Sequence, residues 1–299
     1  MNLICILTYL VAVALLVCAD KDDKASAVTY HEVQLEPVGE ISPKLKIGNR
    51  SEVIPKAVPR RPGFGVSRIV RGDIAAPEKY PYHVGIIVGL GNGWYAFCGG
   101  TLIGNEWIVT AAHCTSGAQT IEVRLGSVNF DTPLRVSWGY QNHIHPNYGK
   151  KNGDIALVKI QWVDYNVNMA PAALPPLNGY QNPYTGARVV ATGWGATDDH
   201  GGKGNLLKYS VMSIIEPQEC ANVYGPNGKD PAIMCTSTKN TGATCSGDSG
   251  GPLVLENTRL LLGVTTFGAA GNCAGGLPDG FSRITFYLSW IKDVTGISW

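Results

Sequence analysis

The sequence has little charge and almost no excess of either sign. Lys, Arg, Asp and Glu make up 16% of the 299 residues, and the formal net charge is +1. Binding to nucleic acid or to an anionic membrane requires a surplus of basic residues, so we expect neither as a partner. Stretches of helical periodicity are few and no internal repeat is found, whereas glycine is frequent, with 37 residues. This combination favours an all-β protein.

The apolar stretch at residues 1–19 has no basic flank long enough to hold it in a membrane. Its length is near the lower limit for a transmembrane helix, which leaves a membrane anchor as the weaker alternative. Val17 and Ala19 occupy the small-residue positions before a cleavage site, and polar residues begin at Asp20. We therefore predict a signal peptide over 1–19 and a secreted, extracellular protein.

No Cys-x-x-Cys pair occurs, and the cysteines outside residues 1–19 are far apart in the sequence, so a metal site is not indicated. We expect no metal and no cofactor. An even number of cysteines in a secreted chain predicts disulfides, although the residues alone leave their pairing open. These cysteines are Cys98, Cys114, Cys220, Cys235, Cys245 and Cys273.

Residues 20–68 contain no cysteine and no sustained periodicity, but they are polar and rich in proline. Such a composition is typical of a segment without a packed core. The segment holds the one Asn-x-Ser/Thr sequon that we find, at Asn49, which makes Asn49 a candidate for glycosylation. We interpret residues 20–68 as a leader that precedes the folded domain.

From Ile69 onward, short apolar or alternating runs recur between Gly, Pro, Asn and Asp residues, as in "HVGIIVGL", "ARVVATGWG" and "RLLLGVTTFG". This pattern predicts an all-β sandwich or barrel. The run "LVLENTRLLLG" predicts a hairpin closed at residues 256–258. The last segment, "TFYLSWIKDV", has apolar residues at helical spacing and ends before Gly296, which predicts a C-terminal α-helix.

Three side chains stand in contexts that suit nucleophilic catalysis. Ser249 lies in the glycine turn "GDSGGP", His113 ends "VTAAH" beside a cysteine, and Asp154 precedes the apolar run "IALVKI". A serine nucleophile needs a histidine that takes its proton and an acid that orients the histidine. We expect His113, Asp154 and Ser249 to form such a triad.

These stretches, together with "RIVRGDIAAPEKYPY" at residues 68–82, resemble the chymotrypsin-like serine proteases of the trypsin superfamily. The resemblance covers residues 69–299, and the order His, Asp, Ser is that of the family. "VTTFG" and the terminal "TGISW" look most like insect digestive chymotrypsin- and elastase-like enzymes. The resemblance implies two six-stranded antiparallel β-barrels with the site between them and a C-terminal helix.

The resemblance also implies specific roles. His113 and Asp154 would come from the first barrel and Ser249 from the second, and the backbone N–H groups of Gly247 and Ser249 would form the oxyanion hole. The implied disulfides are Cys98–Cys114, Cys220–Cys235 and Cys245–Cys273.

Relatives of this kind are made as zymogens. The corresponding cleavage here is between Arg68 and Ile69, after which the α-amino group of Ile69 would pair with Asp248. We therefore expect residues 20–68 to be an activation propeptide. We expect a monomer whose partners are protein or peptide substrates, an activating protease and protein protease inhibitors.

The specificity pocket implied by the resemblance is mainly apolar. Ala243 stands where trypsins carry the aspartate that binds Lys or Arg, Thr244 follows it in the same wall, and Gly268 leaves the mouth open. Asp279 stands where many relatives have glycine, and it would favour basic side chains if it faces the pocket. We expect chymotrypsin-like cleavage with secondary acceptance of basic residues; the alternative is that Asp279 turns outward.

Two other functions fit the same family. A catalytically silent homologue would act as a binding or regulatory protein, but such homologues usually lose the serine or the histidine. An immune-cascade protease often carries a cysteine-rich regulatory domain, and residues 20–68 contain no cysteine. We therefore favour a secreted, digestive endopeptidase.

Overall fold

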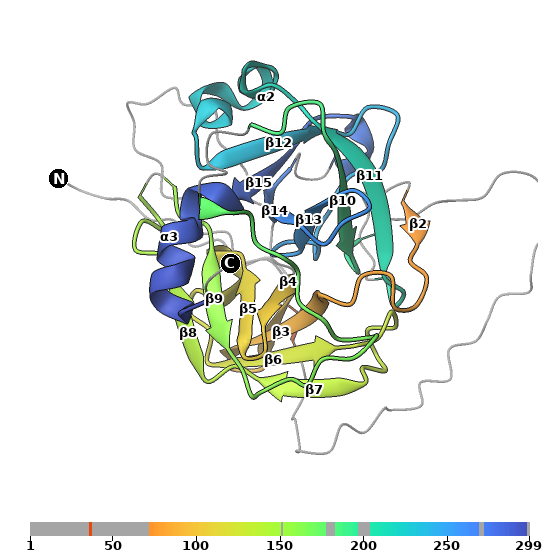
Figure 1. The fold of residues 1–299 in the computed structure, drawn as a ribbon, viewed down its shortest axis with the longest axis vertical. Coiled ribbons are helices and arrows are strands. Elements are labelled where there is room, and N and C mark those ends of the chain that lie inside the picture. The colour runs from red at the N-terminus through yellow and green to blue at the C-terminus, as the bar shows by residue number, and fades with distance from the viewer. Residues whose placement is uncertain are drawn as a thin grey trace, which may run out of the picture.

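The computed structural model describes residues 72–150, 152–177, 183–196, 204–268 and 272–297, together with the backbone of residues 36–37. Two antiparallel sheets stack one above the other, and each closes on itself as a barrel (Figure 1). The predicted signal peptide, Asn49 and the Arg68–Ile69 bond lie outside the described residues.

The first sheet runs in the order β7-β6-β3-β4-β5-β9-β8. Its strands are β3 (His83–Gly91), β4 (Trp94–Gly104), β5 (Trp107–Thr110), β6 (Thr120–Leu125), β7 (Arg135–Trp138), β8 (Gln141–Ile144) and β9 (Ala156–Lys159). Strands β7 and β8 are two halves of one bent strand: Gly139 N–H donates to Ile121 O at 2.8 Å on the β6 side, and Tyr140 N–H donates to Lys159 O at 3.0 Å on the β9 side. The bent strand therefore closes a six-stranded barrel.

The second sheet runs in the order β10-β13-β14-β15-β12-β11, and pairing of β10 with β11 closes it. Its strands are β10 (Arg188–Gly193), β11 (Lys208–Ile214), β12 (Ile233–Ser237), β13 (Pro252–Leu255), β14 (Leu261–Phe267) and β15 (Asp279–Arg283). Short β2 (Asp73–Ile74) extends β11, and β1 (Glu36–Pro37) pairs with the start of β4. The predicted pair of six-stranded barrels is confirmed.

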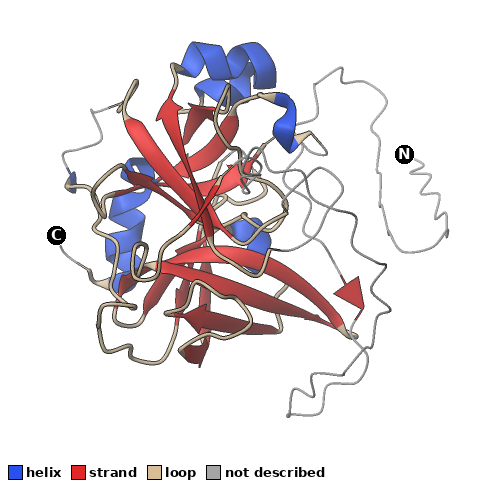
Figure 2. Cartoon of the chain, turned by 90° about the vertical axis from the view of Figure 1, so that its right-hand side faces the viewer, coloured by secondary structure: helices blue, strands red, loops and turns tan. Residues whose placement is uncertain are grey.

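The C-terminal helix α3 (Ile284–Thr295) joins the barrels (Figure 2). It follows β15 of the second barrel directly, yet its buried face, with Ile284, Leu288 and Ile291, belongs to the core that contains Ile86 of β3. Gly296 ends the helix with φ of 70°, a conformation that favours glycine. The prediction of a C-terminal helix with this end is confirmed.

Two further helices were not predicted, namely α1 (Ala112–Thr115) and α2 (Pro217–Tyr224). Both are short, and in α2 only Cys220 is buried, so an apolar stripe is missing from the sequence. Short 3-10 helices follow at Gly225–Lys229 and Cys273–Gly275.

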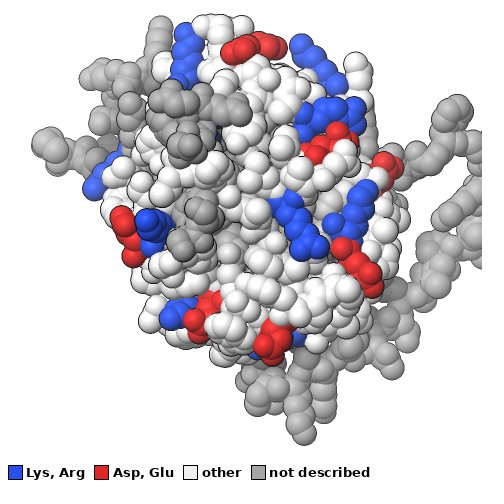
Figure 3. All heavy atoms as spheres, viewed as in Figure 1, with Lys and Arg blue, Asp and Glu red and all other residues white. Residues whose placement is uncertain are grey.

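In the described part of the chain, the helices are too short or too polar to cross a membrane. On the face drawn in Figure 3, acidic and basic side chains are sparse and intermixed.

Candidate active site

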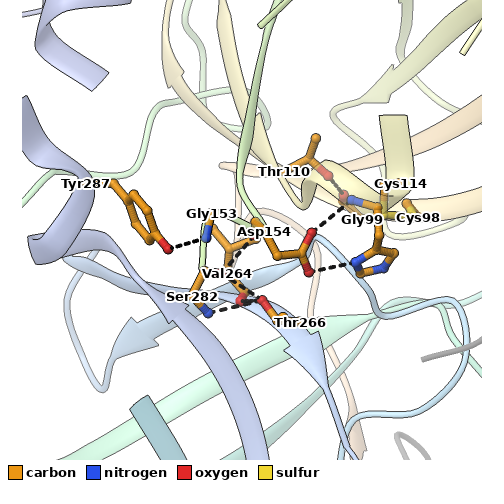
Figure 4. A network of polar contacts seen from close by, with 11 residues as sticks. Cys98, Gly99, Thr110, Cys114, Gly153, Asp154, Val264, Thr266, Ser282 and Tyr287 are labelled. Carbon is orange, nitrogen blue, oxygen red and sulfur yellow. Dashed lines mark hydrogen bonds and ion pairs between the residues drawn. A yellow bond between two sulfur atoms is a disulfide. The ribbon is translucent and has the colours of Figure 1, made fainter. Parts of the chain in front are cut away.

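His113 and Asp154 come from neighbouring strands of the first barrel. His113 lies in α1, directly after β5, and Asp154 directly precedes β9; the two strands pair with Thr110 opposite Ala156. The backbone N–H of His113 donates to Asp154 Oδ1 at 2.8 Å, and the ring Nδ1 lies 2.8 Å from Oδ2 (Figure 4). Strand pairing thus brings together two residues that are 41 positions apart in the sequence.

This geometry determines the chemistry available to His113. With Asp154 ionised, Nδ1 carries the proton and donates it in the hydrogen bond to the carboxylate, so Nε2 of the neutral ring has the free electron pair. Asp154 is only 7% exposed, which keeps solvent from competing for its oxygens. An imidazole held in this tautomer is suited to accept a proton at Nε2.

The backbone around Asp154 is held by the second barrel and α3. Ser282 of β15 donates its hydroxyl to Asp154 O at 2.7 Å, and Gly153 N–H donates to the Tyr287 hydroxyl of α3 at 3.0 Å (Figure 4). Thr266 of β14 contacts Ser282 through their hydroxyl oxygens at 2.9 Å. The roles of Ser282, Tyr287 and Thr266 were not predicted, because ordinary strand and helix positions carry no local signal for such a role.

Ser249 lies in the turn between β12 and β13, and this turn packs against the segment that leads to His113. Gly99 N–H donates to Ser249 O at 2.7 Å. Gly250 has φ of 78°, and a Cβ atom there would overlap the Thr110 hydroxyl and the Gly99 carbonyl. Glycine is therefore required for the turn to approach β4 and β5 so closely.

Two amides of this turn remain available to a ligand. The N–H groups of Asp248, Gly250 and Gly251 donate to backbone carbonyls within the fold. Those of Gly247 and Ser249 have no acceptor among the described residues. Gly247 has φ of 90°, which a residue with a Cβ atom rarely adopts. The turn therefore presents two backbone donors beside the nucleophile candidate.

Asp248 is a buried carboxylate directly beside Ser249. Its Oδ1 accepts a hydrogen bond from Gly195 N–H at 2.8 Å and its Oδ2 accepts one from Cys245 N–H at 2.9 Å. Burial raises the pKa of Asp248 to about 6, against the lowering effect of these bonds and of the Lys208 charge. The predicted partner of Asp248, Ile69, lies outside the described residues.

Asp279 is also buried, at 2% exposure, and it contacts Thr244, another residue of the predicted specificity pocket. The backbone N–H and the hydroxyl of Thr244 donate to Asp279 Oδ2 at 2.6 and 2.9 Å. Asp279 Oδ1 has no hydrogen-bond partner among the described residues. Burial raises the pKa of Asp279 to about 7, although both bonds from Thr244 lower it. Ala243 and Gly268, the other predicted pocket residues, are also buried.

A cleft opens at the junction of the two barrels, next to Asp154. It has a volume of about 290 Å³, and its lining includes Tyr148, Asp154, Thr266 and Phe267. Phe267 packs edge-to-face on Tyr224 of α2, and the Tyr224 hydroxyl donates to Pro278 O at 2.7 Å. Tyr224 thus links this cleft to the segment that leads to Asp279 at the start of β15. The sequence did not predict this role of Tyr224.

The three disulfides are those that the resemblance implied: Cys98–Cys114, Cys220–Cys235 and Cys245–Cys273. The first ties β4 to the helix that holds His113, and the third ties the Ser249 turn to the segment before β15. Within the described residues, the one cluster of three metal-type ligands is Cys98, His113 and Cys114, whose sulfur atoms are joined in that first disulfide.

Two closed six-stranded barrels, with a His–Asp pair and a glycine-bounded serine turn at their junction, define a chymotrypsin-like serine endopeptidase. A sequence model of the Trypsin family matches residues 69–291, and the chain belongs to this family. The resemblance noted in the sequence is therefore confirmed.

Similar proteins come from insects and crustaceans. Serine protease 1 of Drosophila melanogaster is 38% identical, over 78% of this chain and 87% of its own length. Brachyurin of Leptuca pugilator is 37% identical, over 77% of this chain and 100% of its own length. A collagenase of Hypoderma lineatum is 36% identical, over 77% of this chain and 88% of its own. A solved collagenase structure superposes with a TM-score of 0.71 at 33% identity, over 77% of this chain and 100% of that structure.

Proposed function

We propose that the protein is a secreted, digestive serine endopeptidase, made as a zymogen, that cleaves peptide bonds through an acyl-enzyme. The observation that carries the proposal is the pair of 2.8 Å hydrogen bonds between His113 and Asp154, next to the turn that holds Ser249. The three disulfides support an oxidising, extracellular location.

In the proposed reaction, Ser249 Oγ attacks the carbonyl carbon of the substrate while His113 Nε2 takes the hydroxyl proton. The carbonyl oxygen becomes an oxyanion, which accepts hydrogen bonds from the N–H groups of Gly247 and Ser249. His113 then gives its proton to the leaving amine as the C–N bond breaks. Water attacks the acyl-enzyme by the same path, and Ser249 regains its proton.

Activation is proposed to occur by cleavage between Arg68 and Ile69. The new ammonium group of Ile69 would then pair with Asp248, whose burial makes an unpaired negative charge costly. Asp248 already bonds Gly195 and Cys245, so its charge state bears directly on the loop that holds Gly247 and Ser249. Residues 20–68 would be released, since no cysteine ties them to the domain.

The proposed specificity is apolar, with acceptance of basic side chains. Ala243 leaves the base of the pocket uncharged. The bonds from Thr244 to Asp279 support a position of Asp279 against the pocket wall, and its raised pKa supports a protonated, weakly polar state at acid pH.

Sequencing the N-terminus of active protein, together with a titration by a serine-directed acylating inhibitor, tests this function. We expect a start at Ile69 and one mole of inhibitor bound per mole of cleaved protein, with none bound by Ser249→Ala. A cleaved protein that binds no inhibitor and releases no burst from an ester substrate would instead be a silent homologue. Activity with any other N-terminus would contradict the activation step.

A further inference from the structure

A second surface cavity lies on the side of the molecule formed by β10, β11 and the β13–β14 turn. Its volume is about 440 Å³, within the usual range of ligand-binding pockets. None of the residues of the proposed triad or specificity pocket lines it. Its lining includes Lys79, Tyr80, Tyr82, Tyr209, Glu256 and Arg259. We call this the tyrosine cavity.

Three tyrosine rings pack against one another in the lining. The ring centroids of Tyr80 and Tyr82 are 6.2 Å apart, and those of Tyr80 and Tyr209 are 5.5 Å apart. Tyr82 is only 2% exposed, and its hydroxyl has no hydrogen-bond partner in the part of the chain that the structure describes. This hydroxyl is not one of the fully buried polar atoms without a partner, so it reaches the cavity and can donate to an acceptor there.

Two cations of the cavity also have no carboxylate partner among the described residues. Lys79 Nζ lies 3.9 Å from the ring centroid of Tyr209, and the side chain of Arg259 is exposed. The nearby carboxylate of Glu256 is already occupied, because Arg188 donates to both of its oxygens, at 2.6 and 2.9 Å. The local charge that remains is therefore positive.

The charge of Arg259 acts on the buried tyrosine. Burial raises the pKa of Tyr82, and Arg259 opposes that rise. Tyr82 and Arg259 line the same cavity, so one anionic group bound there can interact with both the hydroxyl and the guanidinium. Phenol, ammonium and guanidinium groups all donate hydrogen bonds, so the complementary ligand is an acceptor that carries negative charge.

We propose that the tyrosine cavity binds an acidic peptide segment, with a Glu or Asp carboxylate placed between Tyr82, Lys79 and Arg259. A peptide rather than an inorganic anion is favoured by the size of the cavity and by its apolar walls, which include Val190, Val211 and Val254. The segment belongs to a protein substrate or partner, and the cavity increases affinity for it away from the bond that is cleaved. This inference does not depend on the proposed catalytic mechanism.

Binding is measured by fluorescence anisotropy with the full chain carrying Ser249→Ala, so that the probe cannot be cleaved. The probe is labelled acetyl-Leu-Glu-Glu-Leu-amide, and its Gln-Gln counterpart is the uncharged control. Lys79→Gln with Arg259→Gln removes both cations. Lys292→Gln on α3 is exposed and serves as a charge control outside the cavity.

We expect the acidic peptide to bind at least about tenfold more tightly than the Gln peptide. Its affinity should fall about tenfold or more in the double variant, but not in Lys292→Gln. Tyr82→Phe should weaken binding several-fold while leaving the melting temperature unchanged or higher, because the hydroxyl has no hydrogen-bond partner among the described residues. Equal affinity of both peptides overturns the proposal. If sodium sulfate displaces the labelled probe as strongly as the unlabelled acidic peptide does, the cavity is a general anion site. That result would also overturn the proposal.

Discussion

The hydroxyl of Ser282, in the second barrel, donates a 2.7 Å hydrogen bond to the backbone carbonyl of Asp154, which belongs to the first. The acid that orients His113 is therefore held from two sides: its carboxylate by His113 and its main chain by Ser282. Because the first barrel provides Asp154 and the second provides the Ser249 turn, this bond also fixes the two parts of the site relative to one another.

Ser282→Ala should accordingly lower kcat by about tenfold with little change in KM, because Asp154 loses a constraint on its position. The free energy of unfolding should fall by about 1–3 kcal/mol, since a buried carbonyl loses its partner. A purely structural residue would not alter the pH profile. We expect the lower apparent pKa of the kcat/KM profile to move in Ser282→Ala and to be restored in Ser282→Thr, which keeps the hydroxyl; an unchanged profile would limit Ser282 to a structural role.

The triad itself is tested by non-additivity. Ser249→Ala should remove most of the roughly 10⁶-fold contribution that such triads make to kcat, and His113→Ala should remove about as much. The double variant should be no slower than either single one, because the two groups act in the same step. Single-turnover assays with a chromogenic ester measure this; losses that multiply in the double variant would mean that the two side chains act independently.

The sequence was sufficient to predict strands where apolar runs contain only isolated glycines, as in β3 and β14. It was insufficient for β4, in which Gly99 and Gly100 interrupt the run, and for β15, which starts at Asp279 and Gly280. Glycine and aspartate are depleted in strands, so local preference argues against both. These strands form because their neighbours on both sides pair with them.

In the candidate site, too, local sequence predicts some residues and not others. His113, Asp154 and Ser249 stand in motifs that can be recognised locally, whereas Ser282 reaches Asp154 across 128 positions of sequence. Likewise, Lys79 and Tyr209 meet only because β10 and β11 lie beside the segment that precedes β3. Contacts of this kind depend on the closure of the barrels, and no pattern within one segment predicts them.

His83 should make the fold sensitive to acid. It is 4% exposed, its Nδ1 bonds the Thr192 hydroxyl, and its ring packs edge-to-face on Trp194 with centroids 4.6 Å apart. Burial lowers the pKa of His83 to about 3, whereas in the unfolded chain it is near 6.5. Between these values the unfolded chain binds the extra proton, so stability falls as the pH decreases from about 6.5 to about 3.

The contribution of His83 to this loss is at most about 5 kcal/mol, from the difference between the two pKa values. Urea unfolding at pH 7.5 and pH 4.5 measures it. His83→Gln stays neutral and keeps a group that can bond Thr192, so its stability should change less between the two pH values than that of the wild type. His143→Gln, at a partly exposed position of β8, is the matched control. Equal pH dependence in wild type and His83→Gln would contradict the prediction.

Asp279 should make the specificity depend on pH. Its Oδ2 is satisfied by Thr244, while its Oδ1 has no partner among the described residues and is therefore available to a bound side chain. Since burial raises the pKa of Asp279 to about 7, the carboxyl is neutral near pH 5.5 and ionised near pH 8.5. An arginine side chain stays charged throughout this range. Attraction between the two groups therefore increases as the pH rises.

We expect the ratio of kcat/KM for an Arg substrate to kcat/KM for a Leu substrate to rise about tenfold between pH 5.5 and pH 8.5. A pH effect on the catalytic step itself affects both substrates equally, so it cancels in the ratio. Asp279→Asn keeps an oxygen that can accept from Thr244 but cannot ionise, so its ratio should be low and independent of pH. The control variant Asp164→Asn, which removes an exposed carboxylate, should behave like the wild type. A flat ratio in the wild type would mean that Asp279 does not contact the bound side chain, and a strict preference for Arg at pH 5.5 would contradict an apolar pocket.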